Sequence, residues 1–156
     1  MKKGAPASKL VMGMPLYGRA FTLDKSMDRG GFNNLSVPAR CNGNPGKFTA
    51  ERGFLAYYEI CHLIQDEGWK VVKDEKGRMG PYAYKDRQWV GFDDMNMIKY
   101  KSEYIRKLGL GGGMVWALDL DDFMNRCGQG YHPLMNTIKR VLGPPITNEE
   151  KSARYQ

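Results

Sequence analysis

The chain has 156 residues, which is enough for one domain with a hydrophobic core. Hydrophobic residues make up 42% and charged residues 26%, as is usual for a globular protein. The formal net charge is +7, but the Lys and Arg residues are scattered and no nucleic-acid-binding motif occurs, so we expect no nucleic acid partner. No apolar stretch has the length of a membrane span, so we expect no membrane partner. The first residues lack the pattern of a signal peptide, and we expect them to come from the middle of a chain.

Cysteine and histidine usage gives little support to metal or thiol chemistry. The three cysteines, Cys41, Cys61 and Cys127, fit neither a complete set of disulfides nor a four-ligand zinc site, and no CxxC pair occurs. His62 and His132 lie far apart in sequence, and each is typical of a partly exposed helix or loop position. We therefore expect no metal site, no cofactor and no Cys-His nucleophile pair.

Two short apolar runs, residues 10–14 and 114–118, predict two β-strands. Neither run alternates between apolar and polar residues, which is typical of parallel strands that are buried on both faces. Pro15 cannot donate to a strand ladder, so the first strand should end there. The glycines before the second run allow the chain to leave a preceding helix and to approach a neighbouring backbone closely.

Aromatic and charged residues stand at the carboxyl ends of these runs. Trp116 belongs to the second run, and Tyr17 and Arg19 follow the first, with Gly18 allowing a sharp turn. Folds of the α/β class display their ligand-binding groups at this position. Large aromatic residues are also highly buried on average, so Trp116 can equally be a core residue. Tyr17 and Arg19 can likewise be a strand-end aromatic residue and a solvated cation.

The stretch between the two runs has the pattern of a small α+β unit. Residues 24–48 are rich in Gly, Asn, Pro and Ser and predict a loop. Apolar residues at helical spacing predict an amphipathic helix over 50–66, with Thr49 as its N-cap. Short β segments follow at 69–74, 81–84 and 88–92. Their close spacing predicts an antiparallel meander.

Two further helices complete the chain. Asp93 or Asp94 caps the first, and Gly109 ends it. Pro133 begins the second. Residues 144–156 are predicted to be a polar tail or linker.

The order of predicted elements is therefore strand, insertion, helix, strand, helix. Two parallel strands cannot form a stable sheet alone, and a complete (β/α)8 TIM barrel needs about 250 residues. We therefore predict an α/β chain that is the C-terminal portion of such a barrel, namely its last two βα units, with an inserted small α+β domain. The predicted segments are a first barrel strand at 1–23, the insertion at 24–92, helix, strand and helix at 93–143, and the tail at 144–156.

Four motifs occur in order: MPLYGRAF at 14–21, GFLAYYEIC at 53–61, QWVGFDD at 88–94 and GGMVWALDLDDF at 112–123. Together they resemble the C-terminal part of animal family 18 glycoside hydrolases, the chitinases, and most of all those of arthropods. The resemblance extends over nearly the whole chain. It implies that the two strands are the seventh and eighth of the barrel. It also implies that the insertion forms one wall of a sugar-binding groove.

The resemblance assigns roles in binding chitin or chitooligosaccharides. Trp116 matches the residue that floors the subsite of the reacting sugar, where an apolar sugar face can stack on the ring. Met114 matches a neighbour that lines the same pocket. Tyr17 and Arg19 match groove residues that hydrogen-bond the substrate. Glu51 matches a wall residue that contacts sugar.

The resemblance also bears on the cysteines. Cys61 and Cys127 match a family disulfide, which implies an oxidising, extracellular setting and a signal peptide upstream in a secreted parent protein. Cys41 has no counterpart in the family pattern. Phe54 stands where many relatives have Met, so the sugar contact at this position departs from the family pattern.

The family's catalytic motif, DxxDxDxE, is absent, and so is its strand-six Tyr-Asp pair. Asp119, Asp121 and Asp122 resemble the motif superficially, but no Glu follows at the required offset. The family uses the substrate's acetamido oxygen as nucleophile and one carboxyl as acid/base, in a substrate-assisted retaining mechanism. The resemblance therefore implies a fragment of a secreted chitinase, inactive alone, which hydrolyses β-1,4-linked N-acetylglucosamine polymers when whole. A fragment of a non-catalytic chitinase-like lectin is the alternative.

Overall fold

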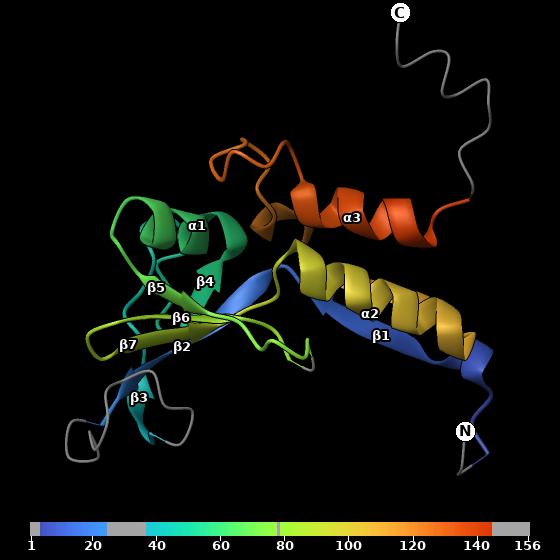
Figure 1. Ribbon diagram of the computed structural model, residues 1–156, viewed down its shortest axis with the longest axis horizontal. Helices are drawn as coiled ribbons and strands as arrows, with labels where there is room; N and C mark the ends of the chain where they lie inside the picture. The colour runs from blue at the N-terminus through green and yellow to red at the C-terminus, as the bar shows by residue number, and fades with distance from the viewer. Residues whose placement is uncertain (1–3, 25–36, 78, 145–156) are drawn as a thin grey trace, which may run out of the picture.

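The structure, a computed structural model, describes residues 4–24, 37–77 and 79–144. The described elements form a two-stranded sheet, a six-stranded sheet and three α-helices. The two-stranded sheet and two helices lie at one end, and the six-stranded sheet and one helix lie at the other (Figure 1). Residues 25–36 of the predicted loop at 24–48, and nearly all of the predicted tail, lie outside the described residues.

The two predicted strands are present and pair in parallel. Strand β1 (Val11–Pro15) follows a short 3-10 helix, η1 (Ala7–Lys9), and pairs with β8 (Gly112–Trp116). The first strand ends at Pro15, as predicted. Its last residue is in register with the last residue of its partner, so the two carboxyl ends meet at one edge.

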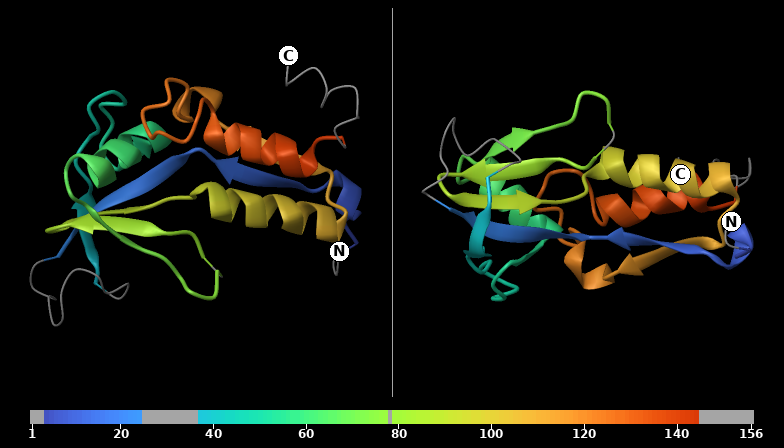
Figure 2. Two further views of the ribbon diagram at one scale, coloured as in Figure 1. Left: turned by 45° about the horizontal axis from the view of Figure 1, so that its top comes forward. Right: turned by 90° about the horizontal axis from the view of Figure 1, so that it is seen from below.

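Helices α2 (Met95–Leu108) and α3 (Pro133–Leu142) lie on one face of these strands (Figure 2). The side chains that they bury with the strands form the larger core. Its fully buried members include Met14, Leu16, Ile98, Ile105 and Leu134. A 3-10 helix, η3 (Leu118–Leu120), connects β8 to the loop before α3.

The prediction that both strands are buried on both faces is wrong. Val11, Met114 and Trp116 are 58%, 49% and 64% exposed, and all three lie on the face away from the helices. None of the described residues forms a layer over that face, whereas the opposite face packs on α2 and α3. Trp116 is therefore not a core residue of this structure.

The second sheet is antiparallel, as the predicted meander required. Its strands run in the order β3-β2-β7-β6-β5, with β4 also paired to β2. Their bounds are β2 Tyr17–Leu23, β3 Ala39–Asn42, β4 Phe54–Ala56, β5 Lys70–Val72, β6 Tyr82–Lys85 and β7 Gln88–Gly91. Strand β3 lies within the stretch that was predicted to be a loop.

Gly18 does not form the predicted sharp turn. Only Leu16 separates β1 from β2, so the chain continues extended and Gly18 lies inside β2. A Cβ atom there would lie 2.6 Å from Val90 Cγ2 and 2.7 Å from Ile60 Cδ1. Gly18 therefore permits close packing between the sheet and helix α1, because any larger residue would overlap these side chains.

Helix α1 (Tyr57–Gln65) covers one face of the six-stranded sheet. The prediction that this helix begins at residue 50 is wrong, because residues 54–56 form β4 and the N-cap is Ala56. Thr49 does not cap the helix. Its hydroxyl instead donates to the Glu59 carboxylate at 2.8 Å, and the same carboxylate accepts the Ala56 N–H at 2.9 Å.

The predicted ends of α2 and the disulfide are confirmed. Asp94 caps α2 by accepting the Met97 N–H at 2.9 Å, and Gly109 ends this helix with a φ of 59°. Cys61 of α1 and Cys127 of the loop before α3 are bonded, and 66 positions separate them in sequence. The disulfide therefore joins the helix on the six-stranded sheet to the loop before α3. Within the described residues, none of the helices combines the length and apolar character needed to cross a membrane.

Candidate functional site

The site begins where the carboxyl ends of β1 and β8 meet. Pro15 is in register with Trp116, and the next residue, Leu16, donates its N–H to the Trp116 carbonyl at 3.0 Å. The Trp116–Ala117 peptide bond is cis. Met114 and Trp116 both present their side chains on the exposed face of the two strands. The predicted residues Met114 and Trp116 are thus together, at the edge where β1 leads into β2.

Tyr17 and Arg19 stand immediately beyond this edge, two residues apart on one face of β2. The Tyr17 ring stacks on the Phe54 ring, with centroids 4.7 Å apart and planes inclined by 29°. The Arg19 guanidinium carbon lies 5.2 Å from the Tyr17 centroid and 5.3 Å from the Phe54 centroid. Cation–π attraction therefore holds the exposed Arg19 side chain over two rings. Phe54 supplies one of these rings through the pairing of β4 with β2.

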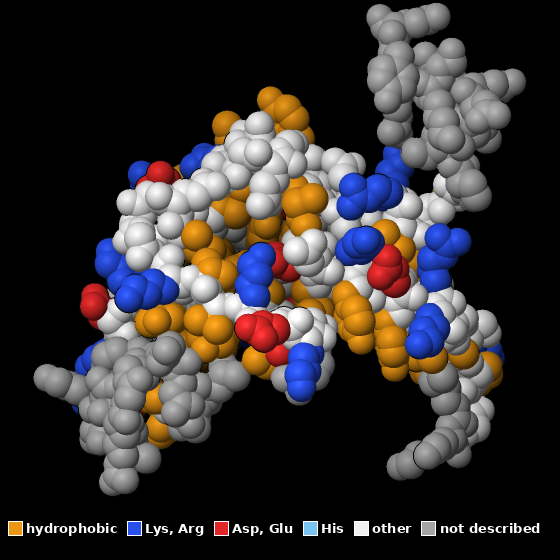
Figure 3. Space-filling view, viewed as in Figure 1, with side chains coloured by type: hydrophobic (Ala, Val, Ile, Leu, Met, Phe, Trp, Pro, Cys, Tyr) orange, Lys and Arg blue, Asp and Glu red, His pale blue; other side chains and the backbone are white. Residues whose placement is uncertain are grey.

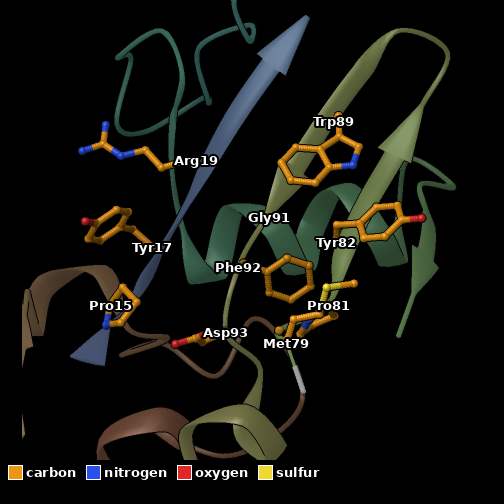
Figure 4. A pocket seen from close by; sticks show the side chains of 11 residues that line it. Pro15, Tyr17, Arg19, Met79, Pro81, Tyr82, Trp89, Gly91, Phe92 and Asp93 are labelled. Atoms are coloured by element: carbon orange, nitrogen blue, oxygen red, sulfur yellow. The ribbon is translucent and has the colours of Figure 1, made fainter. Parts of the chain in front are cut away.

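A hollow of about 360 Å³ lies next to this stack (Figure 4). Tyr17 and Arg19 are on one side of it, and Tyr82, Trp89 and Phe92 are on the other. The residues of the second side were not predicted from the sequence. The strand register reveals them, because Gly91 of β7 pairs with both Arg19 of β2 and Tyr82 of β6. Side chains from the three strands therefore lie on one face of the sheet.

Asp93 is a buried carboxylate that also lines the hollow. Burial raises the pKa of Asp93 above its ordinary value, and the hydrogen bond from Lys101 opposes this rise. The two side chains form an ion pair. The charge of Asp93 is therefore balanced from within the protein.

Glu51 lies in the exposed loop before β4 and does not line the hollow. One buried side chain fixes that loop, since Glu59 accepts the N–H groups of Phe48 at 2.7 Å and Thr49 at 3.0 Å. Gly46 allows the approach, because a Cβ there would lie 2.3 Å from Glu59 Oε1. The structure thus holds the loop in place, while the Glu51 side chain does not join Tyr17 and Arg19 in lining the hollow.

Comparison with known proteins identifies the family of the chain. Residues 1–121 match the sequence model of the family described as glycosyl hydrolases family 18. The chain belongs to this family.

Three relatives show how much of a family 18 protein is present. "Probable chitinase 10" of Drosophila melanogaster is 57% identical over 145 residues, which are 93% of this chain and 6% of that protein. Catalytic domain 2 of the Ostrinia furnacalis Group II chitinase is 48% identical with a TM-score of 0.85, covering 90% of this chain and 36% of that one. Human YKL-39, described as a pseudo-chitinase with retained chitooligosaccharide binding properties, is 41% identical with a TM-score of 0.80, covering 92% and 37%. The chain thus spans far less than two thirds of these relatives.

Two of the three carboxylates that follow β8 have structural partners in this family 18 chain. Asp121 is fully buried and accepts the N–H groups of Leu134 at 3.3 Å and Met135 at 2.9 Å, which caps α3. Asp122 is also fully buried and accepts the Cys127 N–H at 2.7 Å. Their oxygen atoms are therefore engaged in fixing the helix and the disulfide loop.

The remaining chemistry-bearing residues of the described part of the chain form no metal-binding cluster. Among residues 4–24, 37–77 and 79–144, no group of three or more His, Cys, Asp or Glu side chains could hold a metal ion. Cys41 is exposed and is not disulfide-bonded. Lys and Arg side chains are scattered over the face seen in Figure 3 and do not gather in one patch.

Proposed function

We propose that this chain is part of a secreted family 18 chitinase and supplies one wall and part of the floor of its groove for chitin and chitooligosaccharides. The observation that carries the proposal is the strand edge at which Trp116 pairs with Pro15 and from which β2 carries Tyr17 and Arg19 along the hollow. A mutant of the related Ostrinia domain was solved in complex with the chitooligosaccharide (NAG)5, which supports the ligand class.

The side chains suit a neutral sugar. The exposed ring of Trp116 offers a flat apolar surface for a sugar face, and Met114 extends that surface. Tyr17 can donate and accept a hydrogen bond, and Arg19 can donate several to hydroxyl or acetamido oxygens. We assign Glu51 to the outer wall as a further acceptor, carried on the loop that Glu59 fixes.

In the whole protein, the last two βα units of the barrel would carry Met114 and Trp116. The inserted α+β domain, predicted at 24–92, would form the wall. Parallel β1 and β8 with helices on one face, and an antiparallel sheet beside them, support this division. The disulfide supports secretion, because such bonds persist in oxidising compartments.

The proposed reaction is hydrolysis of β-1,4-linked N-acetylglucosamine polymers by the substrate-assisted retaining route. This chain would bind and orient the sugar, and the proton donor would come from a part of the barrel outside these 156 residues. A flat floor that fits the distorted sugar better than the relaxed one lowers the barrier to reaction and not only the dissociation constant.

A chitinase-like lectin is the second candidate, favoured by the likeness to YKL-39. A lectin needs the same rings and donors but no proton donor. The two candidates differ in the residue at the catalytic Glu position of the whole protein. Reading that position from the upstream transcript separates them.

Isothermal titration of the 156-residue chain with chitohexaose tests the binding function, with cellohexaose as the control sugar that lacks acetamido groups. We expect saturable binding of chitohexaose and weaker binding of cellohexaose. The chain should release no fluorescent leaving group from a chitobioside between pH 4 and 8, because it lacks the acid. Absence of chitohexaose binding contradicts the proposed groove, and turnover well above a heat-treated control contradicts the assignment of the acid elsewhere.

A further inference from the structure

We propose that Trp89 is a second stacking platform of the groove and that the hollow beyond Arg19 takes a further N-acetylglucosamine unit of a chitooligosaccharide. This inference rests on the proposed function, since it extends the same groove away from Trp116. Three observations support it: the position of the Trp89 ring, the ring behind it, and the path from Trp116.

Gly91 has no side chain and so leaves room for the Trp89 ring. A Cβ atom on Gly91 would lie 2.8 Å from Trp89 Cη2 and 3.2 Å from Cζ3. The indole therefore lies across its own strand, over Gly91. Because Gly91 pairs with Arg19, this brings the indole toward the Arg19 side of the sheet. Any side chain at residue 91 would displace the ring from the hollow.

Tyr82 supports the indole from the neighbouring strand. The two rings are stacked, with centroids 5.5 Å apart and planes inclined by 27°. Tyr82 is buried, whereas Trp89 is only half-buried, and both line the hollow. Part of the Trp89 side chain therefore stays accessible to a ligand in the hollow. A rigidly backed and partly exposed indole is a suitable surface for stacking a sugar ring.

The hollow begins at the strand edge to which Trp116 belongs. Pro15, the register partner of Trp116, lines the hollow together with Arg19. Arg19 follows Pro15 by four positions, so at about 3.3 Å per residue the path between them is about 13 Å long. A linear oligomer on Trp116 can therefore follow β2 past Tyr17 and enter the hollow.

The charges around the hollow favour a neutral occupant. Its rings are Tyr17, Tyr82, Trp89 and Phe92. Its carboxylate, Asp93, is paired with Lys101, and its cation, Arg19, stands on the rings of Tyr17 and Phe54 with donors available for oxygen atoms. A sugar unit provides apolar ring faces for the indole and oxygen atoms for the guanidinium.

Nuclear magnetic resonance of the indole N–H groups tests this inference directly. The chain has three tryptophans, so three indole signals can be assigned by single Trp→Phe substitutions. The ¹⁵N-labelled 156-residue chain is titrated with chitobiose and with chitohexaose. We expect the Trp116 signal to move with both sugars and the Trp89 signal to move only with the hexaose. Trp69, which lines a separate hollow on the α1 face of the sheet, is the internal control and should not move.

A matched binding measurement adds a magnitude. Trp89→Leu should weaken chitohexaose binding roughly fivefold and leave chitobiose binding within about twofold. Tyr104→Ala, which removes an exposed aromatic side chain from α2, should change neither. A Trp89 signal that stays fixed while Trp116 moves, or that moves equally with chitobiose, overturns the inference and leaves the proposed function standing. If the Trp116 and Trp89 signals both stay fixed at saturating hexaose, both are overturned.

Discussion

The two sheets of this chain differ in how completely they are covered. Helix α1 packs Ile60 against Ala20, Val90 and Leu55 on one face of the six-stranded sheet, and rings support one another on the other face. The β1–β8 pair has helices on one face only, and its other face exposes Met114 and Trp116. The wall of the proposed groove therefore belongs to the six-stranded sheet, which has its own hydrophobic core. The floor belongs to the β1–β8 pair, which helices cover on one face only. Substitutions should accordingly affect stability at the wall and binding at the floor.

The disulfide should give the largest effect, because it joins the helix of one sheet to the last loop of the other. Replacing Cys61 and Cys127 by Ala should lower the free energy of unfolding by about 4 kcal/mol, as loop-closure entropy predicts for a loop of this length. Urea denaturation followed by circular dichroism measures the change. Cys41→Ala is the control and should have little effect, because Cys41 is exposed and unbridged. A double variant as stable as the unaltered chain contradicts this linkage.

Glu59→Ala tests whether one carboxylate fixes the loop that carries Glu51. The change leaves the N–H groups of Phe48, Thr49 and Ala56 without their acceptor, so we expect a loss of about 3 kcal/mol. Hydrogen exchange at those three amides should accelerate more than at the amides of α1. Glu103→Ala, which removes an exposed i,i+4 pair on α2, should cost less than about 0.5 kcal/mol. Equal losses in the two variants would contradict the role of Glu59.

Substitution of one glycine in each sheet compares most directly how well the two sheets tolerate an added methyl group. Gly18→Ala should cost about 2 kcal/mol by overpacking, because its new methyl group meets Val90 and Ile60 in the covered sheet. Gly13→Ala adds the same methyl group to β1, where the nearest atom, Met114 Cε, is 4.0 Å away. Thermal denaturation should therefore show a lower midpoint for Gly18→Ala and a nearly unchanged midpoint for Gly13→Ala. Similar midpoints would show that both sheets tolerate the methyl group equally.

The pH dependence of stability should reveal Asp93. Its pKa is raised in the folded state, so between its ordinary pKa and the raised value the folded chain holds a proton that the unfolded chain has lost. Stability contributed by this group therefore falls as the pH rises through that window. Relative to the unaltered chain, Asp93→Asn should gain stability across the window and then level off. A difference that does not change with pH from 4 to 7 would contradict the raised pKa.

The features that the sequence predicted correctly are local or follow from the resemblance. Pro15 ended its strand, Asp94 capped α2 and Gly109 ended it, because a single residue type decides each of these features. The pairing of Cys61 with Cys127 came from resemblance to a known family and is confirmed.

The errors arose from contacts between distant residues. The start of α1 was misplaced because the hydroxyl of Thr49 bonds to Glu59, ten positions later, and does not cap a helix. Gly18 was assigned to a turn, although it is the packing of Val90 and Ile60 that requires it. Trp89 was not identified as part of the site, because only the register between β2 and β7 brings it beside Arg19.

The roles of Tyr17, Arg19, Glu51, Met114 and Trp116 in binding stay predictions. Their positions could not be derived from periodicity, since the face of β8 that carries Trp116 has the same apolar pattern as the face that packs on the helices. Exposure distinguishes the two faces, and exposure depends on which elements lie over the strand.

The most direct test of the central claim, that Trp116 is a binding residue on an accessible floor, measures stability and binding on one variant. In the 156-residue chain, Trp116→Ala should lower the thermal midpoint by no more than about 3 °C, because little of the ring is buried. The same variant should bind chitotriose at least about fivefold more weakly. A large fall in the midpoint with unchanged chitotriose affinity would show that Trp116 serves packing and would contradict the account.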